Sequence, residues 1–226
     1  MDVTRGRRIL REHLQRSGES MSFTAFLMAC LGQVVAKNKH MQAMRTWRER
    51  LVIFDDVDIN TMFEVEENGR KIIRPHILRA VDKKSFRQLH DEVRAFQAGH
   101  AASREAGFIN RFVLLPGPLR RLFMRILFKT PHRLKAMNGT VSLTAVGMFG
   151  TGGGWGIPVT NHTLQVTLGG IEEQPRLVQG RLENREVLSV TISFDHDIID
   201  GAPAARFTQR LQELVASAAL LDDLDS

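Results

Sequence analysis

Apolar positions recur with helical spacing in four segments of the chain, at residues 4–16, 22–37, 83–97 and about 203–218. In residues 22–37 they form a broad face, and Ser22 precedes that face as a suitable N-cap. Ser85 is placed in the same way before the face of residues 83–97. Cys30 falls inside the second segment among apolar neighbours, so we expect a small core residue and not a nucleophile.

Strand patterns occupy much of the rest of the chain. The segments with this pattern are residues 50–54, 57–69, 71–80, 139–150, 161–171, 176–183 and 187–194. Asn68-Gly69 is a strong hairpin signal between the second and third of them. Strands and helices mix without a strict β-α-β rhythm, which favours an α/β fold with a mixed central sheet and helices packed on it. No linker or repeat divides the sequence, so residues 1–226 are expected to form one domain.

The strand pattern at 187–194 leads directly to a histidine between acidic residues. Alternation places one face apolar and the other hydroxyl-bearing, and His196 would continue the apolar face of Phe194. A neutral imidazole at the end of a buried strand can act as a general base. Asp200 precedes the last helix and could cap it, which would clamp the turn that presents His196. Spacing alone favours the other reading, a surface histidine in an acidic turn.

The glycine-rich stretch at 150–156 suggests a phosphate-binding loop, but its pattern fails. A P-loop needs Gly-Lys-Ser/Thr at its end, and the dinucleotide fingerprint needs a glycine where Trp155 stands. Pro158 and a strand follow in place of a helix. We therefore expect a flexible or tightly turning loop, whose glycines could still admit a long ligand.

The composition is that of a globular protein, with 43% hydrophobic and 25% charged residues. The single cysteine excludes an internal disulfide and fits a reducing compartment. The charged N-terminal sequence lacks the apolar stretch of a signal peptide. These features predict a cytoplasmic location, and no residue pattern predicts a metal site.

Positive charge is concentrated in residues 101–137. Eight basic residues and one acidic residue give this segment +7, against +6 for the whole chain. Stacking aromatics do not alternate with the charges, so we expect no nucleic-acid partner. The segment could be a solvated helical hairpin, a docking or oligomer surface or, as the least favoured reading, a membrane-surface helix. On balance the sequence does not lead us to expect a membrane partner.

The string from Asp195 through His196 to Asp200-Gly201, placed after a strand, resembles the active-site motif of one enzyme family. This family comprises the catalytic domains of the dihydrolipoamide acyltransferases of 2-oxo acid dehydrogenase complexes, which are related to chloramphenicol acetyltransferase. Three further stretches resemble family segments in the same order: the helix after Met21, the passage at 79–93 and the strand at 140–150. The resemblance covers most of the chain apart from 101–137, and it implies a chloramphenicol acetyltransferase-like fold.

The resemblance also implies a mechanism. In the family, the histidine takes a proton from the thiol of coenzyme A or dihydrolipoamide, the thiolate attacks a thioester, and a hydroxyl stabilises the oxyanion. Carried over to this chain, the base is His196, the hydroxyl belongs to Thr144 and the structural carboxylate is that of Asp200. The family's ligand-contacting stretches correspond to Ala145, Gly147 and Gly201.

Several features depart from the family pattern. Asp197 stands where the family usually has arginine, and Thr144-Ala145 replaces a Ser-Asn pair. The family's N-terminal arm, a lipoyl domain and a subunit-binding domain are not expected in residues 1–226. Lipoamide would then arrive on another chain, from a lipoyl-bearing or dehydrogenase-complex partner.

The family forms trimers with active sites between subunits, and some trimers assemble into cages, so a homotrimer is expected here. Two alternatives to a lipoamide acyltransferase stay open. One is a catalytically weak trimeric scaffold or partner-binding protein of the same fold. The other is transfer of the acyl group from coenzyme A to a different small acceptor.

Overall fold

The computed structural model describes residues 1–67, 69–99, 112, 115–147, 152–159 and 161–225. Its centre is a five-stranded sheet in the order β4-β3-β5-β6-β7. The strands are β3 (Ile59–Glu67), β4 (Arg70–Leu78), β5 (Val141–Ala145), β6 (Leu164–Val178) and β7 (Arg181–Phe194). The β3/β5 and β5/β6 pairs are parallel and the other two pairs are antiparallel, so the predicted mixed sheet is confirmed.

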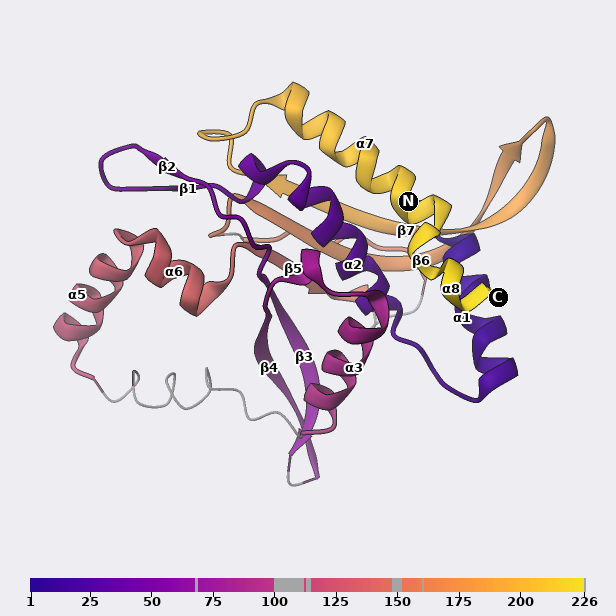
Figure 1. The fold of residues 1–226 in the computed structure, drawn as a ribbon, viewed down its shortest axis with the longest axis horizontal. Helices are drawn as coiled ribbons and strands as arrows, with labels where there is room; N and C mark the ends of the chain where they lie inside the picture. The colour runs from indigo at the N-terminus through magenta and orange to yellow at the C-terminus, as the bar shows by residue number, and fades with distance from the viewer. Residues whose placement is uncertain (68, 100–111, 113–114, 148–151, 160, 226) are drawn as a thin grey trace.

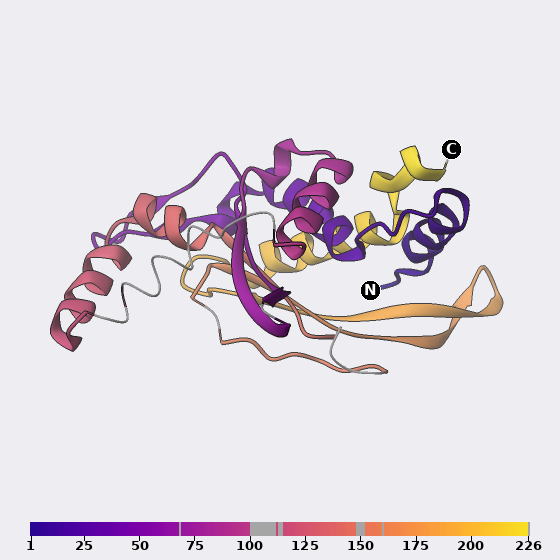
Figure 2. The same ribbon diagram turned by 90° about the horizontal axis from the view of Figure 1, so that it is seen from below.

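Helices pack against one side of this sheet (Figures 1 and 2). They are α1 (Thr4–Ser17), α2 (Phe23–Ala36), α3 (Phe86–Gln97) and α7 (Gly201–Ser217). Ten of the 14 residues of α2 are buried, because this helix lies between α3, α7 and the sheet. Cys30 is fully buried there, and burial raises the pKa of its thiol, as expected for a core residue.

Local capping explains where two of these helices begin. The Ser22 hydroxyl accepts a hydrogen bond from the amide of Ala25 at the start of α2. Ser85 and Gln88 form a reciprocal capping box at the start of α3. Both caps were predicted from the sequence, and both satisfy amide groups that a helix start leaves without a partner.

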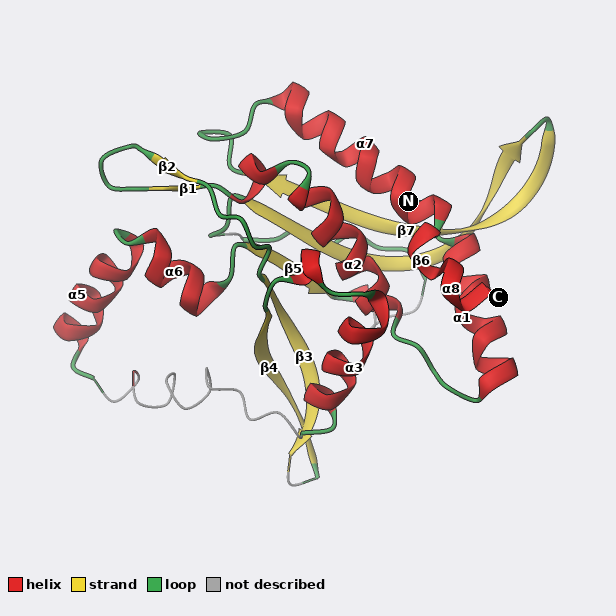
Figure 3. Ribbon diagram, in the orientation of Figure 1, coloured by secondary structure: helices red, strands yellow, loops and turns green. Residues whose placement is uncertain are grey.

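Shorter elements complete the described chain (Figure 3). These are η1 (Lys39–Gln42), β1 (Met44–Arg45), β2 (Leu51–Val52), η2 (Val81–Lys83), α5 (Gly117–Phe128), α6 (Pro131–Asn138), η4 (Ala219–Leu221) and α8 (Asp222–Asp225). The β1–β2 pair forms a separate small sheet, so the strand expected at 50–54 does not join the main one. The α5 and α6 helices lie at one end of the molecule, and the tip of the β6–β7 hairpin lies at the other.

The prediction of a separate strand at 176–183 was wrong. Gln179 and Gly180 both have positive φ, +49° and +81°, and they form the tight turn that joins β6 to β7. Such a turn suits the right-handed twist of a two-stranded hairpin. The strands expected at 161–171 and 187–194 are therefore parts of two longer strands. The hairpin signal at Asn68-Gly69 lies partly outside the described residues, although β3 and β4 do pair as predicted.

The face of the sheet opposite the helices is polar near its centre. Val141 and Leu143 of β5 are buried in the core, so Ser142 and Thr144 face the other way. Thr144 is paired in register with Thr167 of β6. The segment at 152–159 runs past this part of β6, and the Gly154 carbonyl accepts a hydrogen bond from the amide of Gly170.

Candidate functional site

The turn after β7 is held by its own acidic residues and by the core beneath it. The Phe194 ring packs edge-on against Phe207 of α7, with ring centroids 5.8 Å apart. The amide of Asp195 donates to the carbonyl of Thr163, and its carboxylate accepts from the amide of Asp197 at 3.0 Å. Ile199 is buried, which anchors the far side of the turn. The backbone around His196 is therefore fixed from both ends.

The expectation that His196 continues the buried face of the strand was wrong. The chain leaves the sheet after Phe194 and turns, so the side-chain alternation stops and His196 is exposed. Within the described part of the chain, no hydrogen bond or ion pair engages the His196 ring. The imidazole is thus presented at the surface of one chain, where a thiol or another subunit can reach it.

His196 lies at a pocket of about 460 Å³. The other residues that line the pocket are Met44, Arg45, Leu134, Asn138, Asn161, His162, Thr163, Phe194, Asp195 and Ile198. They come from β1, from α6, from the chain before β6, from the end of β7 and from the turn after it. Sequence reasoning missed this group because its members are far apart along the chain.

Two of the missed residues have defined contacts. The Nε2 atom of His162 lies 2.8 Å from the Asn138 carbonyl oxygen, and desolvation by burial lowers the pKa of this histidine. The neutral imidazole donates this hydrogen bond, which fixes α6 against the start of β6. The Asn161-His162 dipeptide directly before a buried strand was the available sequence signal.

Arg45 brings a positive charge to the rim of this pocket. Its guanidinium lies 3.1 Å from the carboxylate of Asp197. The sequence had suggested an uncompensated negative charge beside the histidine, and the ion pair changes that picture. Asp197 stands where the family usually has arginine, and the positive charge of Arg45 on β1 offsets the negative charge of Asp197.

Asp200 occupies the N-cap position of α7 but does not perform the predicted capping. Its backbone is extended and its carbonyl accepts from Ala204, while its carboxylate makes no capping hydrogen bond. The predicted clamp through the carboxylate is therefore wrong within this chain. Gly201 is exposed at the first position of α7, with open space around its Cα.

Ala145 and Gly147 lie in a different hollow from His196. This hollow, of about 390 Å³, is formed between α1, α2 and the strands β5, β6 and β7. A side chain at Gly147 would overlap the backbone of Gly169, so the glycine allows two chain segments to touch. Thr144 points to the polar face of the sheet and does not line the His196 pocket. One chain therefore does not bring His196 and Thr144 together.

The other predicted motifs are placed as follows. Of the glycine stretch at 150–156, the described part from Gly152 onward forms no helix or strand. Residues 100–111 and 113–114 of the basic segment lie outside the described residues, and the rest of it contains α5 and α6. Among the described residues, no group of histidine, cysteine or acidic side chains has metal-binding geometry.

Comparison with known proteins links this site to a family. The model of the 2-oxoacid dehydrogenases acyltransferase (catalytic domain) matches residues 129–221, which include β5, β6, β7, α7 and His196. Over these residues the chain is similar to this acyltransferase family. The match starts directly after α5, so this helix and the N-terminal half of the chain lie outside it.

Curated relatives carry the same description. A lipoamide acyltransferase component of the branched-chain alpha-keto acid dehydrogenase complex of Pseudomonas aeruginosa is 33% identical over 93 residues, which are 40% of this chain and 21% of that protein. A dihydrolipoyllysine-residue succinyltransferase component from Saccharomyces cerevisiae is 30% identical over 79 residues, 34% of this chain and 17% of its own length. The chain thus spans about a fifth of the length of the curated relatives it matches.

Solved acyltransferase structures share the fold over nearly the whole chain. A probable dihydrolipoamide acetyltransferase from Listeria monocytogenes superposes with a TM-score of 0.68 at 16% identity, covering 96% of this chain and 81% of that one. The dihydrolipoamide acetyltransferase of Azotobacter vinelandii gives 0.68 at 20% identity, covering 97% and 80%. The acyltransferase fold therefore extends to the N-terminal half, which the family model does not match.

Proposed function

We propose that this chain transfers an acyl group between coenzyme A and a thiol acceptor such as dihydrolipoamide. The observation that carries the proposal is the placement of His196, in the family-matched region, at a pocket that one chain leaves open. The thiol belongs to the substrate, so the reaction needs no nucleophilic side chain from the protein. Free or protein-borne dihydrolipoamide on a separate lipoyl domain is the proposed acceptor.

The proposed chemistry balances around His196. The neutral imidazole removes the proton of the attacking thiol, and the thiolate adds to the thioester carbonyl carbon. The Thr144 hydroxyl donates a hydrogen bond to the oxyanion that forms. When the tetrahedral intermediate collapses, the carbon–sulfur bond of the original thioester breaks. The leaving thiolate then takes the proton from the imidazolium.

We propose that the active site lies between subunits of a homotrimer. This explains why His196 and Thr144 do not meet within one chain, since the hydroxyl that serves His196 would come from the neighbouring subunit. Trp155, Ile157 and Val159 support the idea, because these three apolar side chains of one short segment are all strongly exposed. One of the solved structures with this fold is the cubic core of a pyruvate dehydrogenase multienzyme complex, and a cage built from trimers is the corresponding higher assembly.

The proposal treats residues 1–226 as one catalytic domain with a cytoplasmic location. In this domain, Ala145, Gly147 and Gly201 line the path of coenzyme A. Arg45 adds a cation beside the His196 pocket that suits an anionic substrate. The Asp200 carboxylate acts through the assembled trimer, because it has no side-chain partner among the described residues of one chain.

A specific observation favours one alternative function. The His196 ring has no hydrogen-bonding partner in the described chain, and the aspartates at 195 and 200 do not orient it. A trimeric scaffold that has lost efficient catalysis would have the same features. Transfer to a small acceptor other than dihydrolipoamide would use the same histidine and differ only in the acceptor.

The decisive experiment measures thiol release from acetyl-CoA and branched acyl-CoAs in the presence of dihydrolipoamide. His196→Ala should reduce turnover by about 100-fold or more, the usual contribution of a general base. His40→Ala, at an exposed histidine outside the pocket, is the matched control and should change turnover less than about twofold. A folded wild-type trimer without turnover would indicate the scaffold, whereas full activity in His196→Ala would exclude this mechanism.

Subunit mixing tests the placement of the site. His196→Ala and Thr144→Val subunits are each expected to be inactive alone. Mixed trimers should recover part of the activity if the two residues act across an interface, because some interfaces then combine both intact side chains. No recovery after verified exchange of subunits would place the residues in one chain's site.

A further inference from the structure

The α5 helix carries an apolar row that no described part of the chain covers. Leu119, Leu122 and Ile126 are 51%, 55% and 45% exposed. Their spacing of three and four residues places them on one side of the helix. Single exposed apolar side chains are common on proteins, whereas an aligned row on a protruding helix marks a binding surface.

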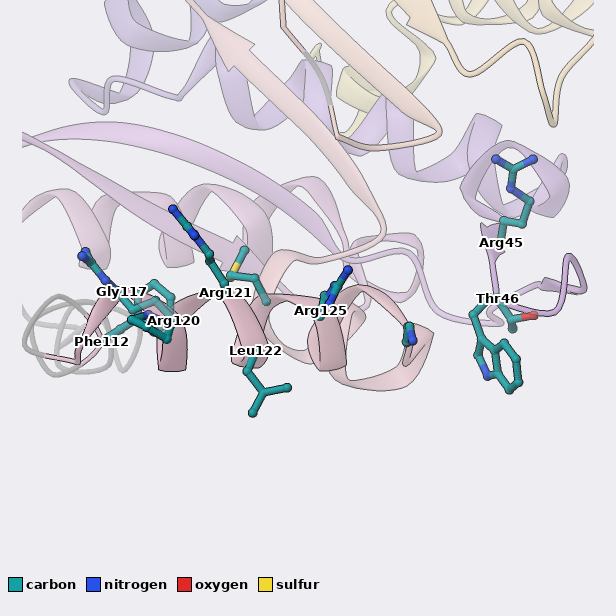
Figure 4. Close-up of a pocket in the computed structure, with 12 residues that line it drawn as sticks. Arg45, Thr46, Phe112, Gly117, Arg120, Arg121, Leu122 and Arg125 are labelled. Atoms are coloured by element: carbon teal, nitrogen blue, oxygen red, sulfur yellow. The ribbon is translucent and has the colours of Figure 1, made fainter.

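Basic side chains occupy the side of α5 opposite Leu122 (Figure 4). Arg121, Arg125 and Lys129 follow one another at intervals of four residues, and all three are exposed. In Figure 4, Leu122 points away from the body of the protein while Arg121 and Arg125 point to the other side of the helix. No acidic residue occurs between Glu105 and Glu172 in the sequence. The stretch of chain that contains α5 therefore contributes cations and no carboxylates to this surface.

A tryptophan lies beside the same surface. Trp47, between β1 and β2, is 64% exposed, and the Lys129 ammonium lies 5.9 Å from its ring centroid. Trp47 and α5 line a common open hollow of about 1280 Å³ (Figure 4). Tryptophan is enriched at the level of lipid headgroups, where its ring is partly apolar and its N–H stays hydrated.

We propose that α5 and Trp47 bind the surface of a membrane that contains anionic lipids. The apolar row would enter the headgroup boundary, and the long cationic side chains on the polar side of α5 would reach lipid phosphates. A helix of 12 residues is far too short to span a bilayer, so it would lie in the plane of the interface. No helix in the described chain is long and apolar enough to cross a membrane.

This occupant fits the surface better than the alternatives. A nucleic acid would require stacking aromatics along the basic row, and α5 presents aliphatic side chains there. An acidic protein would pair with the cations but would not by itself account for a protruding apolar row with a tryptophan at its edge. The exposed row argues against a merely solvated helical hairpin, and the vesicle test below distinguishes a membrane surface from a docking or oligomer surface.

The site would also be near the proposed chemistry. Arg45 lines both the α5 hollow and the His196 pocket. Membrane attachment through α5 would therefore bring the His196 pocket close to the lipid surface. The proposal does not depend on the acyltransferase activity, because lipid binding is measured without substrate.

The test is co-sedimentation of the full chain with vesicles of phosphatidylcholine alone and of phosphatidylcholine with about 30% phosphatidylglycerol. We expect binding to the second type only, reduced at least about fivefold when salt is raised to roughly 0.5 M. In a Trp155→Phe background, Trp47 fluorescence should shift to shorter wavelength on binding. Absence of binding to the anionic vesicles would overturn the proposal.

Matched variants locate the binding surface. The double variants Leu119→Ser/Leu122→Ser and Arg121→Gln/Arg125→Gln should each lower the bound fraction at least about fivefold. The controls Leu177→Ser/Leu182→Ser and Arg176→Gln/Arg181→Gln, at the exposed tip of the β6–β7 hairpin, should retain binding. Equal binding by the α5 variants would overturn the proposal. The proposal would also be overturned if the wild type did not bind vesicles and the α5 variants formed smaller oligomers than the wild type. In that case α5 would contact another copy of the chain.

Discussion

The guanidinium of Arg45 and the carboxylate of Asp197 lie 3.1 Å apart at the rim of the pocket that contains His196. The two residues come from β1 and from the turn after β7. Their pairing offsets the negative charge that stands where the acyltransferase family usually has arginine. The charge beside the histidine is therefore set by a residue outside the family motif and outside the region that the family model matches.

Arg45→Ala should weaken substrate binding more than it weakens catalysis. Removal of the cation leaves Asp197 unpaired beside the site of a polyanionic substrate, so KM for coenzyme A should rise about threefold to tenfold with little change in kcat. Both side chains are partly exposed, and the free energy of unfolding should change by less than about 0.5 kcal/mol. Steady-state kinetics at low and high salt would measure both effects.

A double substitution shows whether the effect of Arg45→Ala on KM comes from the lost charge or from the lost side-chain volume. Adding Asp197→Asn to Arg45→Ala should return KM toward the wild-type value, because neither charge then remains. Lys39→Ala breaks a comparable exposed pair with Asp55 and should leave KM unchanged. If the Arg45 and Asp197 substitutions have independent effects on KM, the ion pair has no role in substrate binding.

Gly147→Ala should destabilise the protein by about 3 kcal/mol or more, because the added carbon would overlap the backbone of Gly169. A backbone cannot move aside as a flexible side chain can. Gly201→Ala is the control, because no atom lies within 4 Å of the position that the added Cβ would take. Replacing glycine by alanine at the start of a helix should slightly raise the free energy of unfolding, since it lowers the conformational entropy of the unfolded chain. Denaturant unfolding of both variants checks this, and a cost below about 1 kcal/mol for Gly147→Ala would show that the two segments can separate.

In the separated single chain, Asp200→Ala should cost less than about 0.5 kcal/mol of folding stability, because the carboxylate makes no capping hydrogen bond there. Ser85→Ala should cost about 1 kcal/mol, since it removes an observed capping box. Both measurements use urea unfolding at one protein concentration. A larger cost at Asp200 than at Ser85 would mean that the carboxylate gains a partner in the assembled protein.

The stability of the fold should fall as the solution is acidified below about pH 6.5, the ordinary pKa of histidine. Desolvation by burial lowers the pKa of both His90 and His162, so the unfolded chain binds more protons than the native state in this range. The native state then loses stability with falling pH and regains it as pH rises toward 7. Each tenfold difference in proton affinity between the unfolded and the native state changes the free energy of unfolding by up to about 1.4 kcal/mol.

Glutamine substitutions assign this pH dependence. His162→Gln keeps a donor for the Asn138 carbonyl, and His90→Gln keeps an acceptor for the amide of Ser22. Each should flatten the dependence of the unfolding free energy on pH, and the double variant should flatten it further. An unchanged profile in the double variant would place the titrating groups elsewhere.

The local features of the fold were predictable from sequence. The helices that begin after Ser22 and Ser85 depend on periodicity and on side chains a few residues apart, and both were predicted with their caps. The β6–β7 turn was missed because Gln179-Gly180 is a weaker hairpin signal than Asn-Gly, and the surrounding residues keep a strand pattern. Strand patterns also do not reveal where a strand leaves the sheet, which is why His196 was expected to be buried.

The site was predictable only in part. The motif around His196 is continuous in sequence and identified the family. Arg45 and His162 reach the same pocket through tertiary packing, so no local pattern connected them with His196. Thr144 was predicted beside the histidine, but within one chain it faces another surface. A site completed by a second subunit cannot be read from spacing along one chain.

The position of β5 between β3 and β6 has a consequence for biosynthesis. The β3–β4 hairpin can form early from neighbouring residues, but the second edge of β3 stays open until Val141–Ala145 has left the ribosome, and β5 itself waits for β6. Parallel pairing of strands that are far apart in sequence is slow. Until it is complete, the open edge of β3 can pair with strands of other chains. We expect nascent chains stalled before β5 to be held by chaperones, and the sheet to close only when β5 is inserted.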